Sequence, residues 1–225
     1  MRVISVDGGT TTTGLVVLDF ADGAVQQRAV LAVDAWPTRS PDRTGLRCRT
    51  RGPLVGDLEF SVTSPLEAVR WLTDHLGAEL AGAVCAVEAV EWYYSDKARA
   101  GAGRGQDFVD LVSTAARIAE RLTVATGVEC VRPTANQWRA GVFGLSSSLK
   151  GAAADRAVKA HLDAAGMTPL LSKAAGHVYD ATGIGMLAAR KADPKIRFPL
   201  AVFRRVTATP AGPRGARTAR SARAR

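Results

Sequence analysis

The sequence has few cysteines, and those few are far apart. They stand at positions 48, 85 and 130 of a 225-residue chain, an odd number without a Cys-x-x-Cys pair. This pattern excludes a disulfide framework and a cysteine-based zinc site, and it favours the reducing cytoplasm. The chain opens directly on a strand pattern and has no apolar run long enough to span a bilayer. We therefore expect no secretory signal peptide and no membrane partner.

Acidic residues are missing from the C-terminal stretch 204–225, which carries seven arginines. The whole chain has a net charge of +9, so subtracting these seven charges leaves only +2 for residues 1–203. The Pro/Gly/Ala/Arg/Thr composition predicts a disordered arginine-rich tail over 204–225. A basic tail favours a polyanion, most simply nucleic acid, and the alternative is a solubilising end without a partner.

Residues 1–203 carry the pattern of one α/β domain. Three meandering strands open it at about 3–7, 15–19 and 25–33, and an exposed basic insertion, at most a ragged hairpin, follows at about 34–63. Helical patterns lie at about 64–80, 107–125, 136–140, 150–164 and 177–190, and two later strand patterns lie at 83–88 and 128–131. This order predicts a mixed five-stranded sheet with helices on both faces.

A carboxylate directly follows two of the apolar strand patterns. Asp7 ends the first strand and precedes two glycines and four threonines, while Glu88 ends the apolar run Ala83–Val87. If these strands are neighbours, the two carboxylates meet at one edge of the sheet, where open α/β sheets bind ligands. Alternatively, the two residues have no common role: Asp7 only forms an Asx turn, and Glu88 is an ordinary surface residue after a strand.

A histidine and an aspartate three residues apart start the last helical pattern. His177 and Asp180 therefore share one helix face, although either could also be an ordinary residue of a first turn. Together with Asp7 and Glu88 they would bind Mg²⁺, with Mn²⁺ as a substitute, because hard cations prefer oxygen ligands. Two such ions activate a water and stabilise the leaving oxygen of a phosphodiester.

The order of these motifs resembles the RuvC-type Holliday-junction resolvases of the ribonuclease H-like superfamily. The matching strings are Ile4–Thr11 with Gly14, Ala86–Val90 and His177–Ala181, and the resemblance covers roughly residues 1–190. It implies a ribonuclease H-like fold and a homodimeric endodeoxyribonuclease of DNA recombination and repair. Such an enzyme binds branched DNA and resolves four-way junctions by paired, metal-dependent hydrolysis. The resemblance assigns metal binding and catalysis to Asp7, Glu88, His177 and Asp180, and catalysis also to Lys150.

The stretch after Glu88 mixes aromatic and basic residues. Aromatic rings stack on exposed bases and cations contact phosphates, so this stretch is a candidate DNA-binding loop. In the resolvases that the chain resembles, an aromatic residue near this point meets opened base pairs. The alternative is that the rings pack under the following helix. The candidate DNA-binding residues are Trp92, Tyr93, Tyr94, Lys97, Arg99 and Arg104.

Other functions stay open at this point. The string Asp7-Gly8-Gly9-Thr10-Thr11 also resembles the first phosphate loop of ATP-binding sugar and acetate kinases, which share the ribonuclease H-like sheet. Those proteins need a second phosphate loop and an adenosine loop, and the sequence shows neither. If the carboxylates failed to converge, the protein would be a non-catalytic DNA-binding protein on the same fold. A third alternative is a related nuclease that acts on flaps or forks. The Ala/Arg/Gly-rich composition favours a high-GC genome and fits a phage form of the family.

Overall fold

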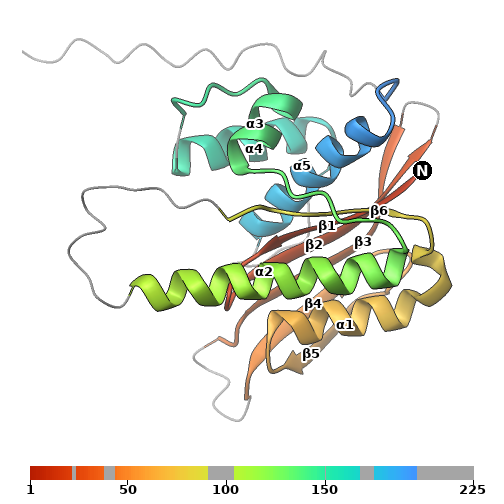
Figure 1. Cartoon of the computed structure of the whole chain (residues 1–225), viewed down its shortest axis with the longest axis vertical. Coiled ribbons are helices and arrows are strands. Elements are labelled where there is room, and N and C mark those ends of the chain that lie inside the picture. Colours follow the sequence, from red (N-terminus) through yellow and green to blue (C-terminus); the bar gives the residue numbers. More distant parts are fainter. Residues whose placement is uncertain (22–23, 38–43, 91–103, 150, 168–174, 197–225) are drawn as a thin grey trace, which may run out of the picture.

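The computed structural model describes residues 1–21, 24–37, 44–90, 104–149, 151–167 and 175–196 (Figure 1). Its centre is a six-stranded sheet in the order β5-β4-β3-β2-β1-β6. The strands are β1 (Arg2–Gly8), β2 (Thr13–Ala21), β3 (Ala24–Ala35), β4 (Leu46–Arg51), β5 (Leu58–Val62) and β6 (Val84–Val87). All neighbouring strands are antiparallel except β1 and β6, which are parallel. The predicted mixed sheet is therefore confirmed.

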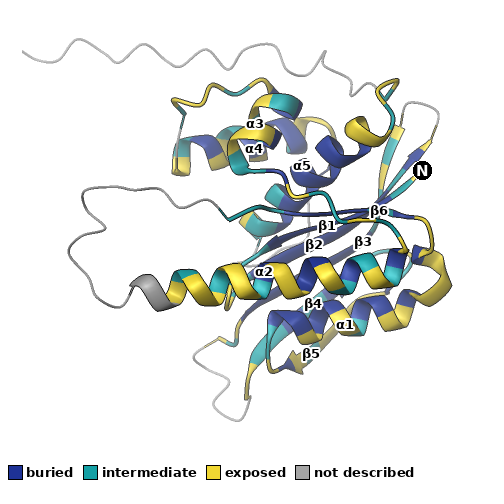
Figure 2. Cartoon of the chain, in the orientation of Figure 1, coloured by how far each residue is buried: buried dark blue, intermediate teal, exposed yellow. Residues whose placement is uncertain are grey.

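Helices cover both faces of this sheet, as the sequence predicts. One face carries α1 (Pro65–Leu76), the short 3-10 helix η1 (Gly77–Leu80) and α2 (Arg104–Thr126), while α5 (Ala175–Ala192) lies directly on the other (Figure 1). Against α5 pack α3 (Ala135–Phe143) and α4 (Ala152–Ala164). The central strands β1, β2 and β6 are almost entirely buried, whereas β5 at the edge is largely exposed (Figure 2). No helix in the described ranges is long and apolar enough to cross a membrane.

Two hydrophobic cores result from the alternation of side chains along the strands. In β2, Val16 and Leu18 point to the α5 side, and Leu15 and Val17 point to the α1 and α2 side. All four side chains are fully buried. Because both faces of the central strands are covered, they appear in the sequence as nearly continuous apolar runs.

The helix ends follow from local sequence signals. The Ser64 side chain accepts a hydrogen bond from the Glu67 amide, and a proline occupies the first turn of α1. A capping box between Thr134 and Gln137 starts α3, and Gly144 ends it in the left-handed conformation at φ 64°. These caps fix where α3 begins and therefore which of its residues face the centre of the molecule.

The predicted number of strands is wrong, because the sheet has six strands rather than five. The insertion at 34–63 is not merely an exposed segment but supplies the edge hairpin of β4 and β5, in which Cys48 of β4 is fully buried. Arginines alternate with the inward residues of β4, so their charge hides the strand pattern in the sequence. Residues 128–131, predicted as a strand, form only one bridge, between Val131 and Ala86. Pro133 then lacks the amide that a longer ladder would need.

Candidate metal and catalytic site

The first two carboxylates of the predicted site lie at the same edge of the sheet. In the parallel pairing of β1 and β6, Val6 is opposite Val87, so Asp7 and Glu88 follow the same pair of residues. The Glu88 amide donates to the Val6 carbonyl oxygen at 3.1 Å, which extends the pairing to the glutamate. The two carboxyl groups then come within hydrogen-bonding contact of each other. The two strands that precede Asp7 and Glu88 are therefore neighbours, as the convergence of the two carboxylates requires.

The start of α5 reaches these carboxylates because β2 has no side chain at Gly14. A Cβ atom on Gly14 would lie 2.2 Å from the carbonyl carbon of His177, much closer than packed atoms approach. In the sheet, Gly14 is the partner of Asp7. The second turn of α5 is also tied to β1, since the Ser5 hydroxyl donates to the Ala181 carbonyl oxygen at 2.7 Å. The backbone of α5 thus lies directly on the strands beside Asp7.

His177 is held at both of its ring nitrogens. Nδ1 lies 2.6 Å from Asp7 Oδ2, and Nε2 lies 2.9 Å from Thr12 Oγ1. With a carboxylate at Nδ1, this nitrogen carries the proton, and Nε2 of the neutral ring accepts from the threonine hydroxyl. The hydrogen bond to Asp7 is the largest cause that raises the pKa of His177, and burial opposes it. The site therefore fixes the imidazole and favours its charged form.

Asp180 lies one helical turn after His177 and is paired with an arginine. Arg139 Nη2 donates to Asp180 Oδ2 at 3.3 Å and to Asp155 Oδ1 at 3.1 Å. Burial is the largest cause that raises the pKa of Asp180, to about 7, and the charge of Asp7 adds to it, while Arg139 acts in the opposite direction. Asp180 is therefore close to half-protonated at neutral pH when no cation is bound.

Glu88 is held by an indole. Trp138 Nε1 donates to Glu88 Oε1 at 3.1 Å, and the Trp138 side chain is fully buried. Its ring packs over Gly183 of α5, where a Cβ atom would lie only 2.7 Å from the indole. Burial, followed by the charge of Asp7, raises the pKa of Glu88 to about 9. Without a cation, Glu88 is a neutral acid at pH 7.

This donor set fits a hard divalent cation in its chemistry. Three carboxyl groups and an imidazole share the sheet edge, where burial, followed by the charge of Asp7, raises the pKa values of Glu88 and Asp180. A divalent cation would supply the missing positive charge. Within the described ranges, however, no three His, Cys, Asp or Glu side chains stand close enough to hold an ion as they are. Asp7 faces His177 and Asp180 faces Arg139, so these pairs have to open.

A cleft of about 350 Å³ lies beside the site, between α4 and α5. His177 and Asp180 line it from α5, and Arg156 and Lys159 line it from α4. The Lys159 ammonium donates to the Tyr179 hydroxyl at 3.1 Å, which holds it over this part of the cleft. Lys159 is also ion-paired with Asp163 at 2.5 Å, so Arg156 and Lys159 bring positive charge next to the candidate carboxylates, and Lys159 would have to leave Asp163 to contact an anionic group such as a phosphate.

Several predicted site residues lie outside the described part of the chain. Lys150 is one of them, and so are Trp92, Tyr93, Tyr94, Lys97 and Arg99. Arg104 begins α2, but its side chain is outside the described set. The catalytic role of Lys150 and the DNA-binding roles of the others therefore stay predictions.

Four side chains of the site were missed by the sequence analysis. Thr12 contacts His177, Trp138 contacts Glu88 and Arg139 contacts Asp180, while Asp155 contacts Arg139. Thr12 stands in the Gly/Thr run after Asp7, so its position was visible although its partner was not. Trp138 and Arg139 look in the sequence like ordinary residues of a short helix. The capping box before them was the available signal, since it fixes which face of α3 they occupy.

Solved structures provide the likeness to known proteins. No protein-family model matches the chain, and the search of curated proteins gives no match. RuvC of Thermus thermophilus in complex with a Holliday junction substrate is 15% identical, with a TM-score of 0.50 over 85% of this chain and 94% of that one. Another T. thermophilus RuvC structure is 16% identical, with a TM-score of 0.47 over 87% and 98%. The fold implied by the sequence resemblance is therefore confirmed.

Proposed function

We propose that the protein is a structure-selective DNA endonuclease that resolves four-way junctions. One observation carries the proposal: Asp7, Glu88 and the first turn of α5 meet at one sheet edge. The fold around them is that of T. thermophilus RuvC, which has been solved with a Holliday junction substrate. A shared fold alone does not give a shared activity, so the proposal rests on the carboxylates and their surroundings.

Asp7, Glu88 and Asp180 would hold Mg²⁺, or Mn²⁺ in its place, and His177 would complete the set. When bound, the divalent ions polarise a water molecule and stabilise the oxygen that leaves the phosphodiester. The chain's own residues prepare this chemistry. Glu88 and Asp180 release the protons that burial keeps on them, and the Trp138 indole keeps Glu88 oriented.

Arg139 and His177 also act in the metal-free protein, where Arg139 is paired with Asp180 and His177 with Asp7 until a cation binds. Asp155 already accepts a hydrogen bond from Arg139, so the guanidinium keeps a partner when Asp180 turns away. His177 keeps Thr12 at Nε2 when its bond to Asp7 opens. Both groups therefore stay hydrogen-bonded in either arrangement, which lowers the cost of opening the site.

The DNA would be bound by cations around the site. Arg156 and Lys159 of the cleft lie beside His177 and Asp180, where a phosphate of the cut strand would pass. The aromatic and basic stretch 91–104 and the arginine tail would extend this contact to the branch point and to the flanking duplex. Deleting 204–225 should flatten the salt dependence of binding and leave single-turnover cleavage at saturating protein unchanged.

A homodimer follows from the reaction, because a junction needs two symmetric cuts and each chain offers one site. The exposed side of α2 is the candidate interface. Val109 and Val112, three residues apart in the first half of this helix, are 56% and 37% exposed and lie on one helix face. Sedimentation of the free protein and of its junction complex tests this, and a monomer in both would contradict the proposed function.

The decisive experiment compares substrates side by side. Four-way junction, fork, flap and plain duplex are each incubated with Mg²⁺ and with Ca²⁺, and ATP hydrolysis is measured in parallel. We expect symmetric nicks in the junction with Mg²⁺, and binding with little cutting with Ca²⁺. Preferential cutting of forks or flaps would reassign the substrate. ATP hydrolysis without nicking would favour a kinase-like protein, and junction binding without nicking under any metal would favour a binding protein.

A further inference from the structure

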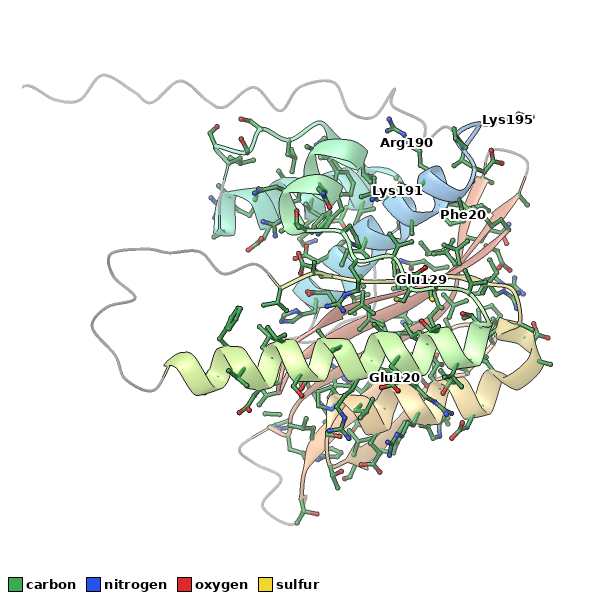
Figure 3. All side chains as sticks on the ribbon, in the orientation of Figure 1. Phe20, Glu120, Glu129, Arg190, Lys191 and Lys195 are labelled. Carbon is green, nitrogen blue, oxygen red and sulfur yellow. The ribbon has the colours of Figure 1, made fainter. Side chains whose placement is uncertain are left out.

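Two of the three cysteines, far apart in the sequence, lie side by side in the fold. The segment after α2 runs along β6, and the bridge between Val131 and Ala86 is parallel. The Val131 amide donates to the Cys85 carbonyl oxygen at 2.8 Å. This register places Cys130 beside Cys85. Glu129, labelled in Figure 3, marks the segment where it passes β6.

The two thiols contact each other and differ in exposure. The Cys130 and Cys85 side chains are hydrogen-bonded, and the Cys85 thiol also donates to the Val128 carbonyl oxygen at 3.2 Å. Cys85 is fully buried, whereas Cys130 is half-buried and open to small reagents. The third cysteine, Cys48, points into the core from β4, and burial raises the pKa of its thiol to about 12.

We propose that Cys85 and Cys130 form a reversible oxidation site, which a hydroperoxide converts into an intramolecular disulfide. One sulfur of the pair, as a thiolate, attacks a peroxide oxygen, the O–O bond breaks, and the released hydroxide takes up a proton. The resulting sulfenic acid is then attacked by the second sulfur, which forms the S–S bond and expels water. Overall, two thiols and one hydrogen peroxide give one disulfide and two waters.

The surroundings favour the first step. The hydrogen bond from Cys130 is the largest cause that lowers the pKa of Cys85, to about 7, and the Thr126 hydroxyl contributes in the same direction. The same hydrogen bond raises the pKa of Cys130, so Cys85 is the sulfur of the pair that becomes a thiolate, and the thiolate is the form that reacts with peroxides. Adjacent positions on paired segments also fall within the Cα separation that a disulfide requires.

The bond would connect two parts of the candidate site. Cys85 stands three residues before Glu88 on β6, and Cys130 stands on the segment that leads to Trp138, which holds Glu88. The closed loop contains all of α2. Cross-linking a loop of this length restricts the unfolded chain, so oxidation should raise the midpoint of thermal unfolding.

The test uses the full-length protein and hydrogen peroxide. After mild treatment and denaturation, we expect the titratable thiols to fall from three to one, with the remaining thiol on Cys48. Peptide mass spectrometry should show a link between the Cys85 and Cys130 peptides, and dithiothreitol should restore all three thiols. The unfolding midpoint should rise on oxidation and return on reduction.

Two variants make the assignment specific. Cys48→Ala should still form the disulfide, and Cys130→Ser should form none and show no rise in the unfolding midpoint. Cys130 is half-buried, so its serine variant is expected to fold. Retention of three thiols in the treated parent, links only between separate chains, or sulfinic acids without a link would each overturn the proposal. Peptide mapping of the parent gives this result even if a variant does not fold.

Discussion

Two regions of the sheet bury carboxylates and treat them differently. In the edge region, Asp34 of β3 is 1% exposed and accepts hydrogen bonds from Arg47 at 3.0 and 3.2 Å and from Arg49 at 3.2 Å. One buried negative charge there meets two guanidinium groups. This arrangement links β3 to β4 and leaves no charge for a ligand.

At the other end of the sheet, carboxylates outnumber the cationic groups. Asp7, Glu88 and Asp180 share one arginine and one imidazole, and burial together with mutual repulsion raises the pKa values of Glu88 and Asp180. The first region is an ion pair that stabilises the fold, and the second keeps negative charge that a cation can use. Strongly raised pKa values of carboxylates are frequent at functional sites, and they make this second region, rather than the Asp34 pair, the candidate site.

The strongest test of this contrast replaces carboxylates on the site side. Asp7→Asn and Asp180→Asn keep the shape and remove a charge, so divalent ions should be lost and junction cleavage should fall by more than about 100-fold. Junction binding should persist or tighten, because repulsion from phosphates decreases. Cleavage and gel-shift assays on the same preparations measure both effects. Variants that cut at the parent rate would remove the catalytic assignment.

The matched change on the structural side is Asp34→Asn. It leaves Arg47 and Arg49 largely buried with no carboxylate, which should lower the free energy of unfolding by roughly 3 kcal/mol. Asp180→Asn should be neutral or stabilising in metal-free protein, since it relieves crowding. Denaturant unfolding of the two variants measures the difference. Equal destabilisation by both would show that the two regions do not differ as described.

The pH dependence of stability should show the same contrast. The pKa values of Glu88, Asp180 and His177 are raised by folding, so the folded chain binds more protons than the unfolded chain between about pH 5 and pH 9. Metal-free protein should therefore lose stability as the pH rises through this range.

Thermal unfolding at a series of pH values checks this expectation. Glu88→Gln should flatten the curve, because the variant no longer has a proton to lose there, and saturating Mg²⁺ should flatten it by compensating the charge. A parent protein whose stability increases from pH 5 to pH 9 would show that the site carboxylates are not crowded in solution.

The smallest expected effect concerns the orientation of Glu88. Trp138→Phe removes the indole N–H and keeps an aromatic ring over Gly183, so the hydrogen bond at 3.1 Å is lost. We expect a cost of about 1 kcal/mol in stability and a fall in cleavage of about 10-fold or more. The Mg²⁺ concentration for half-maximal cleavage should increase. Trp138→Leu, which removes the ring as well, serves as the packing control and should destabilise further.

The sequence predicted the parts of the site that depend on local order. Strand ends place Asp7 and Glu88, and helical spacing places His177 and Asp180 on one face, so each position follows from its immediate neighbours. The partners of these residues could not be predicted in this way. Trp138 is 50 residues from Glu88, and Arg139 is 41 residues from Asp180, so only the packing of α3 against α5 brings them together.

The fold shows the same division between local and distant information. The meander, the helix caps and the two-sided layering follow from hydrophobic periodicity and capping residues. The edge hairpin was predicted only as a ragged hairpin within an exposed insertion and not as part of the sheet, because the arginines of β4 that pair with Asp34 look like a solvated basic segment until β3 is beside them. The Cys85 and Cys130 pair was hidden for a similar reason, since it depends on the register of two distant segments.

Gly14 has a consequence for how such a protein can evolve. Because the His177 backbone occupies the space of a Cβ at this position, the separation between β2 and α5 is set by the smallest residue available. The absence of a side chain at Gly14 therefore affects both the stability of the fold and the spacing of the candidate site. Selection for activity and selection for folding act on it in the same direction. Neither property can drift at this position without the other, so divergence has to occur in the partners around it.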